Sequence, residues 1–253
     1  MVTPEPTIPD HYEPGPDLLA GRVILVTGAG HGLGRAVAIA CASHGATVAL
    51  LGRRQEKLEA TYDAISAAKG AEPALVPLDL AAAGSAEYES LAQVIRKDMK
   101  RLDGIAHCAS HFVPLGPLAN QTIETWMTLF RVNLAAPFAI TRACLPLLAA
   151  AADASVVFTG ETHGARPAAY WGGFAVSKSG LSPLVHIWAD ERSRTPVPRM
   201  NVLIPGPIAS PQRARSHPGE DPTGLRTVEE AARGFLYLLG PESVSITGKT
   251  LEM

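Results

Sequence analysis

The stretch Val26-Thr27-Gly28-Ala29-Gly30-His31-Gly32-Leu33-Gly34-Arg35 decides the fold, because it joins a short apolar run to an amphipathic one. Residues 23–26 are β-branched-rich and predict a buried strand, whereas residues 33–43 repeat apolar side chains at helical spacing. Glycines between a strand and a helix permit a tight turn and close approach of the backbone, and the start of the helix offers free N–H groups to an anion. The stretch therefore predicts a phosphate-binding loop between the first strand and the first helix.

The rest of the chain continues this alternation. Short apolar runs that end near Gly, Pro, Asp or Thr predict strands at residues 23–26, 47–51, 74–78, 104–107, 155–159 and 200–204. Amphipathic runs predict helices at residues 33–43, 55–69, 86–101, 123–152, 173–193 and 228–239, the last with Thr227 as its N-cap. Strands that alternate with helices indicate a parallel sheet with right-handed crossovers and helices on both faces, hence an α/β fold.

Composition limits the classes of function. The formal net charge is −2 and no block of Lys or Arg appears, so we expect neither a nucleic-acid partner nor a membrane surface. Cys41, Cys108 and Cys144 are odd in number and fit neither a metal site nor a disulfide framework, which favours free thiols and a cytoplasmic protein. Residues 1–20 are rich in proline and acidic residues, so we expect an extended arm rather than a signal peptide, followed by one domain over residues 21–253.

The spacing Gly28-x-x-x-Gly32-x-Gly34 after Thr27 resembles that of the short-chain dehydrogenase/reductase family, and the resemblance covers nearly everything after the arm. It implies a Rossmann-type, doubly wound, mostly parallel seven-stranded sheet and a nicotinamide dinucleotide cofactor. It also implies that Asp79 and Leu80 contact adenine, that Cys108-Ala109-Ser110 occupies the loop after the fourth strand, and that Pro205-Gly206-Pro207-Ile208 holds the carboxamide. The expected cofactor-binding residues are Gly28, His31, Gly32, Leu33, Gly34, Arg53, Arg54, Asp79, Leu80, Cys108, Ala109, Lys178, Pro205, Gly206 and Ile208.

The end of the second strand selects the cofactor. NAD-binding proteins typically place a carboxylate there for the ribose 2′-hydroxyl, but this chain has Leu51-Gly52-Arg53-Arg54. Arg53, together with Arg54, can form bidentate bonds to a 2′-phosphate, and His31 can add a further donor. The alternative is that both arginines are solvated residues at the start of a helix. The pattern favours NADP(H) over NAD(H).

The family's catalytic residues are a Tyr-x-x-x-Lys pair, a Ser after the preceding strand and an Asn in the long helix before it. Lys178 and Asn133 match two of these positions. Phe174 stands at the position of the Tyr, and Glu161 stands thirteen residues earlier at that of the Ser. The resemblance therefore implies a catalytic tetrad from which the general acid and the usual hydroxyl donor are missing.

These two replacements leave several chemistries open. A phenyl ring has no proton to give, and an ionised Glu161 accepts hydrogen bonds but donates none. Glu161 either pairs with Lys178 as a buried ion pair, the commoner arrangement for buried charge, or acts as a relocated acid. His163 and Tyr170 are further candidates for acid–base work, Tyr170 because it precedes Phe174 by one helical turn if the helix starts early. Each is otherwise a packing or rim residue.

The resemblance and the two replacements lead to two possible functions, and no residue pattern indicates a substrate for either. The first is an NADP(H)-dependent oxidoreductase for a carbonyl/alcohol pair, with weak or rearranged activity. The second is a catalytically silent NADP(H)-binding sensor, regulatory subunit or partner protein. Residues 210–223 carry Arg213, Arg215 and His217 and form either a mobile lid or a surface loop. Ala-rich faces in the helices at 123–152 and 173–193 predict a homodimer or homotetramer, as in the family.

Overall fold

The computed structural model of the protein describes residues 7–9, 12–192 and 197–253. Its centre is one seven-stranded sheet in the order β3-β2-β1-β4-β5-β6-β7, and every pair of neighbouring strands is parallel. The strands are β1 Val23–Thr27, β2 Thr47–Gly52, β3 Ala74–Pro77, β4 Gly104–His107, β5 Ser155–Thr159, β6 Arg199–Ile204 and β7 Lys249–Glu252. This architecture confirms the predicted doubly wound fold.

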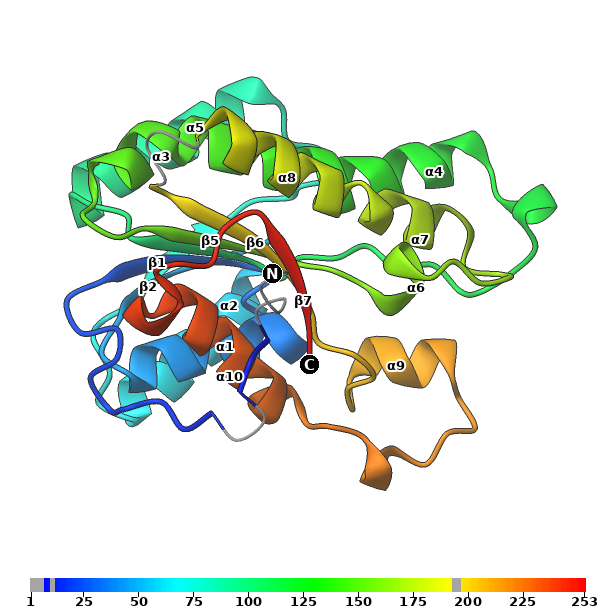
Figure 1. The fold of residues 1–253 in the computed structure, drawn as a ribbon, viewed down its shortest axis with the longest axis horizontal. Helices are drawn as coiled ribbons and strands as arrows, with labels where there is room; N and C mark the ends of the chain where they lie inside the picture. The colour runs from blue at the N-terminus through cyan, green and yellow to red at the C-terminus, as the bar shows by residue number, and fades with distance from the viewer. Residues whose placement is uncertain (1–6, 10–11, 193–196) are drawn as a thin grey trace, which may run out of the picture.

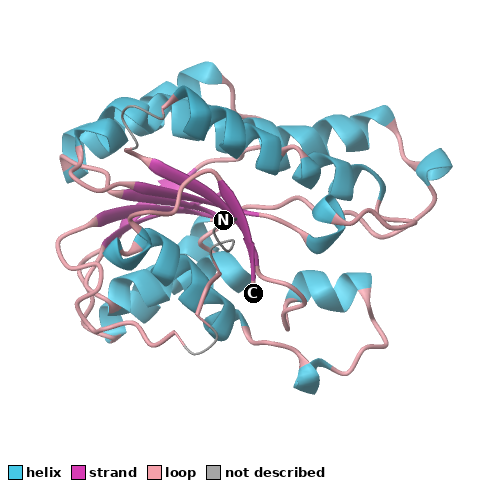
Figure 2. Ribbon diagram, viewed as in Figure 1, coloured by secondary structure: helices cyan, strands magenta, loops and turns pink. Residues whose placement is uncertain are grey.

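Helices cover both faces of the sheet (Figures 1 and 2). One face carries α1 Gly32–Ser43, α2 Gln55–Ala67 and α10 Val228–Leu239, and the other carries α3 Ser85–Val94, α5 Ala136–Ala150 and α8 Leu181–Glu191. Shorter helices extend beyond the sheet: α4 Ile123–Phe130, α6 Thr162–Ala165, α7 Gly172–Ser179 and α9 Pro211–Ser216. Thr227 caps α10 as predicted, because its hydroxyl accepts from Glu230 N and the Glu230 carboxylate accepts from Thr227 N.

The core has two apolar layers because alternate side chains of each strand point to opposite faces. In β1, Ile24 and Val26 join the layer beneath α1 and α10, whereas Val23 and Leu25 join the layer beneath α3 and α5. All five residues of β1 are buried, as expected for a central parallel strand. Helices on both faces hold the strands in place. The loops that follow the carboxyl ends of the strands therefore lie close to one another.

Most predicted elements agree with the structure to within one or two residues at their ends, and three helices are subdivided. The predicted helix at 86–101 ends as α3 and continues as the π-helical turn η1 Ile95–Met99. The helix at 123–152 contains a second π-helical turn, η3 Arg131–Ala135, between α4 and α5. The helix at 173–193 divides at Gly180 into α7 and α8, and its last predicted residue lies outside the described residues.

The described part of the predicted N-terminal arm packs on the domain. Ile8 and Leu19 are buried in the apolar layer of α1 and α10, and Glu13 pairs with Arg233 at 2.8 Å. Tyr12 lies edge-on to Tyr237, with ring centroids 5.1 Å apart. Residues 1–6 and 10–11 of the arm lie outside the described residues. The arm therefore extends the core of the same polypeptide along α10.

The continuous helical region Ile123–Ala150 is long and apolar enough to cross a bilayer, with a mean hydropathy of 1.5 in its most apolar window. It is longer than the apolar stretch that the sequence shows at 145–152, because α4, η3 and α5 follow one another without a break. Half of that window is buried inside the fold, where α5 covers the sheet. The buried half of this window therefore belongs to the core of the domain.

Candidate active site

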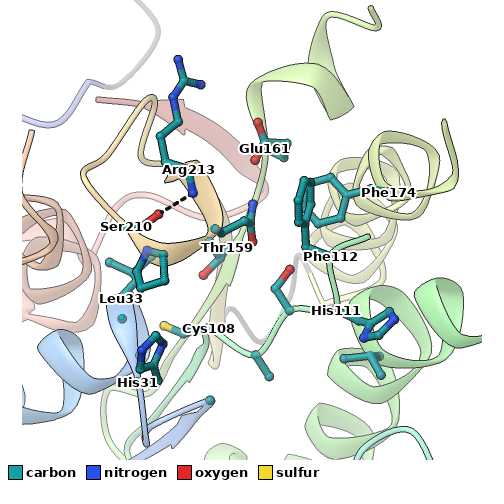
Figure 3. Close-up of a pocket in the computed structure, with 18 of the residues that line it drawn as sticks. His31, Leu33, Cys108, His111, Phe112, Thr159, Glu161, Phe174, Ser210 and Arg213 are labelled. Carbon is teal, nitrogen blue, oxygen red and sulfur yellow. Dashed lines mark hydrogen bonds between the residues drawn. The ribbon is translucent and has the colours of Figure 1, made fainter. Parts of the chain in front are cut away.

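A pocket of about 820 Å³ opens at the carboxyl ends of β1, β2, β4, β5 and β6. This edge is where the strand order reverses between β1 and β4, the place where open parallel sheets bind ligands. Figure 3 shows His31 and Leu33 on one side of the pocket and Phe112 and Phe174 on the other, with Cys108, Thr159 and Glu161 between them. We call the first, with residues 28–34, 53–54 and 79–80, the glycine-loop side. The second, with Phe112, Glu161, His163, Trp171 and Phe174, is the aromatic side.

The glycine loop has the geometry that a phosphate group requires. Gly28 has φ +71°, and a Cβ there would lie 2.8 Å from the Cα of Ala109. A Cβ on Gly34 would collide with the Gly28 carbonyl, so Gly34 permits α1 to pack against β1. Gly32 has φ +53° and its Cβ position faces open space, with the nearest atom 3.9 Å away. Gly28 and Gly34 thus have the tight turn and the close helix–strand packing expected of them, and the start of α1 offers an anion free N–H groups.

The second strand presents basic groups to the same side. Arg53 and Arg54 line the pocket together with His31, and both arginines are exposed to solvent. Arg54 lies 3.9 Å from Glu56, a surface contact that contributes little. Asp79 and Leu80 line the pocket after β3, and Asp79 Oδ1 accepts from Ala81 N at 2.9 Å. The predicted set for the adenosine end of a dinucleotide thus lies on one wall.

The floor is formed by two loops that the sequence also indicated. Cys108 and Ala109 line the pocket after β4, and Thr27 Oγ1 accepts from Ala109 N at 3.1 Å. Burial raises the pKa of the Cys108 thiol to about 12, although the Thr159 side chain and the charge of Lys178 act in the opposite direction. Pro205, Gly206 and Ile208 line the pocket after β6, and Arg226 holds the Pro205 carbonyl at 2.9 Å.

Lys178 lies at the pocket floor, where it is buried. Its Nζ donates to the Thr159 carbonyl at 2.9 Å. Burial lowers the pKa of Lys178 to about 8, and the nearby charges of Glu161 and Cys108 raise it again in part. Beside it, Thr159 Oγ1 is buried and has no hydrogen-bond partner among the described residues. A buried ammonium group and an unpaired hydroxyl beside the pocket fit the hydroxyl and amide groups of a nicotinamide riboside.

Asn133 does not line the pocket, and its contacts explain why it is retained. Its Oδ1 accepts from His111 N at 2.7 Å, and its Nδ2 donates to the His111 carbonyl at 3.0 Å. The same Nδ2 donates to Ser177 Oγ at 3.0 Å. The π-helical turn η3 carries this side chain inward. Asn133 therefore fastens the loop after β4 to α7, which positions both walls of the pocket.

The expected ion pair between Glu161 and Lys178 is wrong. Among the described residues, Glu161 Oε1 contacts His163 Nδ1 at 3.3 Å, whereas Lys178 donates to a backbone carbonyl. The reason is local: β5 ends at Thr159, and the short helix α6 turns His163 back over Glu161. Both side chains line the pocket and keep about a fifth of their surface exposed.

Phe174 is packed into an aromatic cluster with Phe112, Trp171 and Leu129. Its ring lies edge-on to Phe112, with centroids 5.0 Å apart, and only 1% of its surface is exposed. His163 stacks on Trp171 at 3.7 Å, which joins the Glu161–His163 pair to the cluster. Trp171 and Phe112 were not predicted as site residues, since aromatic residues in loops carry no periodic signal that would place them together.

The proposed place of Tyr170 on the helix face of Phe174 is also wrong. Helix α7 begins at Gly172, and Tyr170 lies before it with a left-handed backbone of φ +73°. Its side chain is 60% exposed and is not part of the pocket wall. Its carbonyl accepts from Gly116 N at 3.0 Å, a contact that ties two loops together. Tyr170 is therefore outside the site.

The segment 210–223 contains α9, and residues 210–213 and 215–217 of this segment line the pocket. Ser210 caps α9, as the dashed line in Figure 3 marks, and Arg213 pairs with Glu220 at 2.6 Å. The Arg215 guanidinium lies 5.3 Å from the centroid of the Phe112 ring. Arg213, Arg215 and His217 all line the pocket. The basic residues of this segment thus border the aromatic side.

Together these groups can bind a dinucleotide and present its reactive end to a small aromatic chamber. The titratable side chains lining the aromatic side and its border are Glu161, His163, Lys178, His111, Arg213, Arg215 and His217. The described pocket wall there contains no tyrosine, and its hydroxyl groups belong to Ser110, Thr159, Thr162, Ser210 and Ser216. Phe174, one helical turn before Lys178 on α7, contributes a phenyl ring to this wall.

A model of the short chain dehydrogenase family matches residues 22–221 of the chain. The uncharacterized oxidoreductase YciK of Escherichia coli K12 is 38% identical over 242 residues, which cover 96% of this chain and 95% of that protein. A short chain dehydrogenase of Salmonella enterica serovar Typhi superposes with a TM-score of 0.92 at 37% identity, covering 95% of this chain and 99% of its own. A protein of Escherichia coli CFT073, solved in complex with NADPH, superposes with a TM-score of 0.91 at 38% identity, covering 94% and 99%.

Proposed function

The chain belongs to the short chain dehydrogenase family, and on that premise we propose that it binds NADP(H) in preference to NAD(H). The single observation that carries the proposal is the geometry of the glycine-loop side. The exposed guanidinium of Arg53 lines the pocket just after β2, where a carboxylate would repel a ribose 2′-phosphate, and His31 lines the same pocket. The similar protein solved with NADPH supports the same choice. When bound, this cofactor supplies or accepts a hydride.

Titration with NADPH and with NADH, followed by calorimetry, tests this proposal. We expect Arg53→Ala to weaken NADPH binding by about 10- to 100-fold, the value of a charge-assisted bond to phosphate, and to leave NADH binding unchanged. Arg35→Ala is the matched control, because Arg35 is exposed on α1 but does not line the pocket. Failure of both nucleotides to bind, or an equal loss for both in the Arg53 variant, would contradict the proposal.

For the reaction, we propose an oxidoreductase whose activity on ordinary carbonyl/alcohol pairs is weak or rearranged. Phe174 cannot protonate an alkoxide, and loss of a positioned general acid costs about 10²- to 10⁴-fold in rate. Glu161 and His163 line the pocket and contact each other, which makes them the groups able to move a proton there. Lys178 binds at the pocket floor, and Asn133 positions the loop after β4.

A second candidate is a catalytically silent NADP(H)-binding sensor, regulatory subunit or partner protein. The burial of Phe174 in the aromatic cluster favours it, because that ring stabilises the wall of the pocket without any chemical role. A silent protein binds NADPH and consumes none with any substrate offered. An active one loses turnover when Glu161 or His163 is replaced, while NADPH binding persists.

We further propose that the protein is cytoplasmic and forms a homodimer or homotetramer. Cys41, Cys108 and Cys144 are free thiols, which suits a reducing compartment. Phe138 on α5, Val176 on α7 and Ile187 on α8 are exposed apolar residues on the helices expected to pack between subunits. Light scattering of the purified protein measures the mass of the assembly directly.

A further inference from the structure

The carboxylate of Glu161 on the aromatic side disfavours the reduction of a neutral carbonyl and favours a substrate that carries a positive charge. Hydride transfer to a neutral carbonyl produces an alkoxide, which needs hydrogen-bond donors and a proton. The chain instead presents the Glu161 carboxylate, which accepts hydrogen bonds when ionised, and the Phe174 ring, which has no proton. A carboxylate at this position repels a developing oxyanion. It stabilises a substrate that is positively charged at the reacting group.

Hydride transfer to an iminium ion creates no anion. The imine carbon accepts a hydride from the reduced nicotinamide cofactor, the C–H bond forms, and the electron pair of the C=N bond becomes the lone pair of an amine nitrogen. The nitrogen keeps the substituents or the proton it already had, so no acid is required in this step. The cofactor is oxidised and takes over the positive charge. One positive charge is present before and after the step, so the charge balances without a proton transfer.

We infer that the aromatic side accepts a cationic imine, that is, a protonated or N-alkylated C=N compound, as the hydride acceptor in place of a ketone or aldehyde. The inference rests on the proposed NADP(H) function and names the substrate class of that site. It turns the two departures from the family's tetrad into one consistent change. Phe174 in place of the Tyr removes an acid that iminium reduction does not need. Glu161 in place of the Ser adds a negative charge that stabilises the cationic substrate.

The surroundings of Glu161 support this assignment. The contact of Glu161 Oε1 with His163 Nδ1 holds the carboxylate over the pocket, and the stack of His163 on Trp171 fixes that pair. Arg213, a cation at the border of the aromatic side, pairs with Glu220, and among the described residues no lysine or arginine forms an ion pair with Glu161. The aromatic rings add faces that attract cations. Arg215 already uses the Phe112 ring in this way, at 5.3 Å.

A pair of bicyclic probes of equal size tests the inference by turnover. N-methyl-dihydroisoquinolinium carries a fixed positive charge, and tetralone is a neutral ketone. With NADPH, and after subtraction of the reaction without protein, we expect kcat/KM for the iminium to exceed that for tetralone by at least about 100-fold, because only the ketone needs the missing acid. The Glu161→Gln variant should lower the iminium value by about 10- to 100-fold.

The matched control is Glu229→Gln, which removes an exposed carboxylate on α10, outside the pocket. It should leave both probes unchanged. NADPH binding by each variant is measured in parallel, so a failed cofactor site is recognised as such. Binding of NADPH without preference for the iminium overturns the inference alone, whereas loss of NADPH binding in the unaltered protein overturns the proposed function beneath it.

Binding gives a second readout that does not depend on turnover. Dimethyl-tetrahydroisoquinolinium is a cation that cannot accept hydride, and isochroman is its neutral counterpart. In the presence of NADP⁺, we expect the cation to change Trp fluorescence, since Trp171 lines the pocket, and to bind about 10-fold or more tightly than isochroman. Glu161→Gln should remove this difference. Equal binding of the two ligands to the unaltered protein, or a preference that persists in the variant, contradicts the inference.

Discussion

The two sides of the pocket differ in what their function depends on. The glycine-loop side works through the backbone: Gly28, Gly32 and Gly34 create space, and α1 presents its free N–H groups there. The aromatic side works through side chains, and Glu161 and Phe174 stand there at the positions that the resemblance assigns to the family's Ser and Tyr. Backbone geometry is part of the fold, so changing it disturbs the structure. Side chains at a pocket wall can change while the fold stays intact.

A difference of this kind allows a protein to keep a cofactor site while its reaction changes, as we propose for this chain. Asn133 and Lys178 contribute to cofactor binding and to the reaction alike. Asn133 fastens the loop after β4, and Lys178 lies at the pocket floor. Phe174 also contributes to packing, as its ring fills the cluster with Phe112, Trp171 and Leu129. Three changes separate the two sides experimentally.

The largest expected effect comes from restoring the family's side chains on the aromatic side. The double variant Glu161→Ser with Phe174→Tyr should raise NADPH-dependent reduction of tetralone by about 10²- to 10⁴-fold, the usual contribution of a general acid. NADPH affinity should stay within about twofold, because neither residue lies on the glycine-loop side. Product formation by mass spectrometry and NADPH oxidation measure the gain. Phe130→Tyr, outside the pocket, is the control, and an unchanged rate in a variant that binds NADPH would show that the aromatic side lacks more than these two groups.

The next effect comes from Gly32→Ala on the glycine-loop side. A side chain there occupies the open position at the start of α1, so we expect NADPH affinity to fall by roughly 100-fold, about 3 kcal/mol. Gly21→Ala is a close control, since Gly21 also has a left-handed backbone, φ +71°, with nothing within 4 Å of its Cβ position. Both variants should lose about 1 kcal/mol of stability in thermal unfolding, but only Gly32→Ala should lose NADPH binding. An equal loss in the two variants would mean that backbone strain, and not the phosphate position, sets the affinity.

The smallest effect concerns Lys178, which joins the two sides. Burial holds its pKa at about 8 in the folded protein, against 10.5 as its ordinary value. Between these pH values the unfolded chain binds more protons, so this residue makes the folded state more stable as pH rises. Relative to Lys178→Met, the protein without cofactor should gain about 1 kcal/mol in the free energy of unfolding between pH 8 and pH 9. The free energy of unfolding is measured with urea for both proteins at each pH. If it changes with pH by the same amount in both, burial does not lower the pKa of Lys178.

Sequence patterns predicted the fold well because its signals are local. Each strand is a short apolar run that ends at a turn residue, and the glycine loop lies between a strand and a helix, where its meaning is clear. The glycine-loop side follows directly from these elements. Gly28, Gly32 and Gly34 lie where their spacing indicated, and Arg53 follows from its place at the end of β2.

The aromatic side was harder to predict because it depends on loop conformations. The partner of Glu161 depends on the turn of α6, which brings His163 rather than Lys178 into contact. The placement of Tyr170 on the face of Phe174 required the helix to start before residue 170, but α7 starts at Gly172, and Tyr170 and Gly172 have φ values of +73° and +43°. The pair Gly172-Gly173 was the available sequence signal. The cluster of Phe112 with Trp171 joins residues far apart in the chain, and no periodic pattern connects them.

The π-helical turn at Arg131–Ala135 gives this half of the molecule a place that can absorb a change in chain length. A π turn holds more residues than an α turn, so deleting one residue there would allow a regular α-helix. Because the extra residue fills one wider turn, the residues before the deletion would keep their orientation about the helix axis relative to α5. Leu129 would stay in the aromatic cluster, and Trp126 would stay beside Gly173. The loss would fall on the turn itself, which carries the Asn133 side chain to His111 and Ser177.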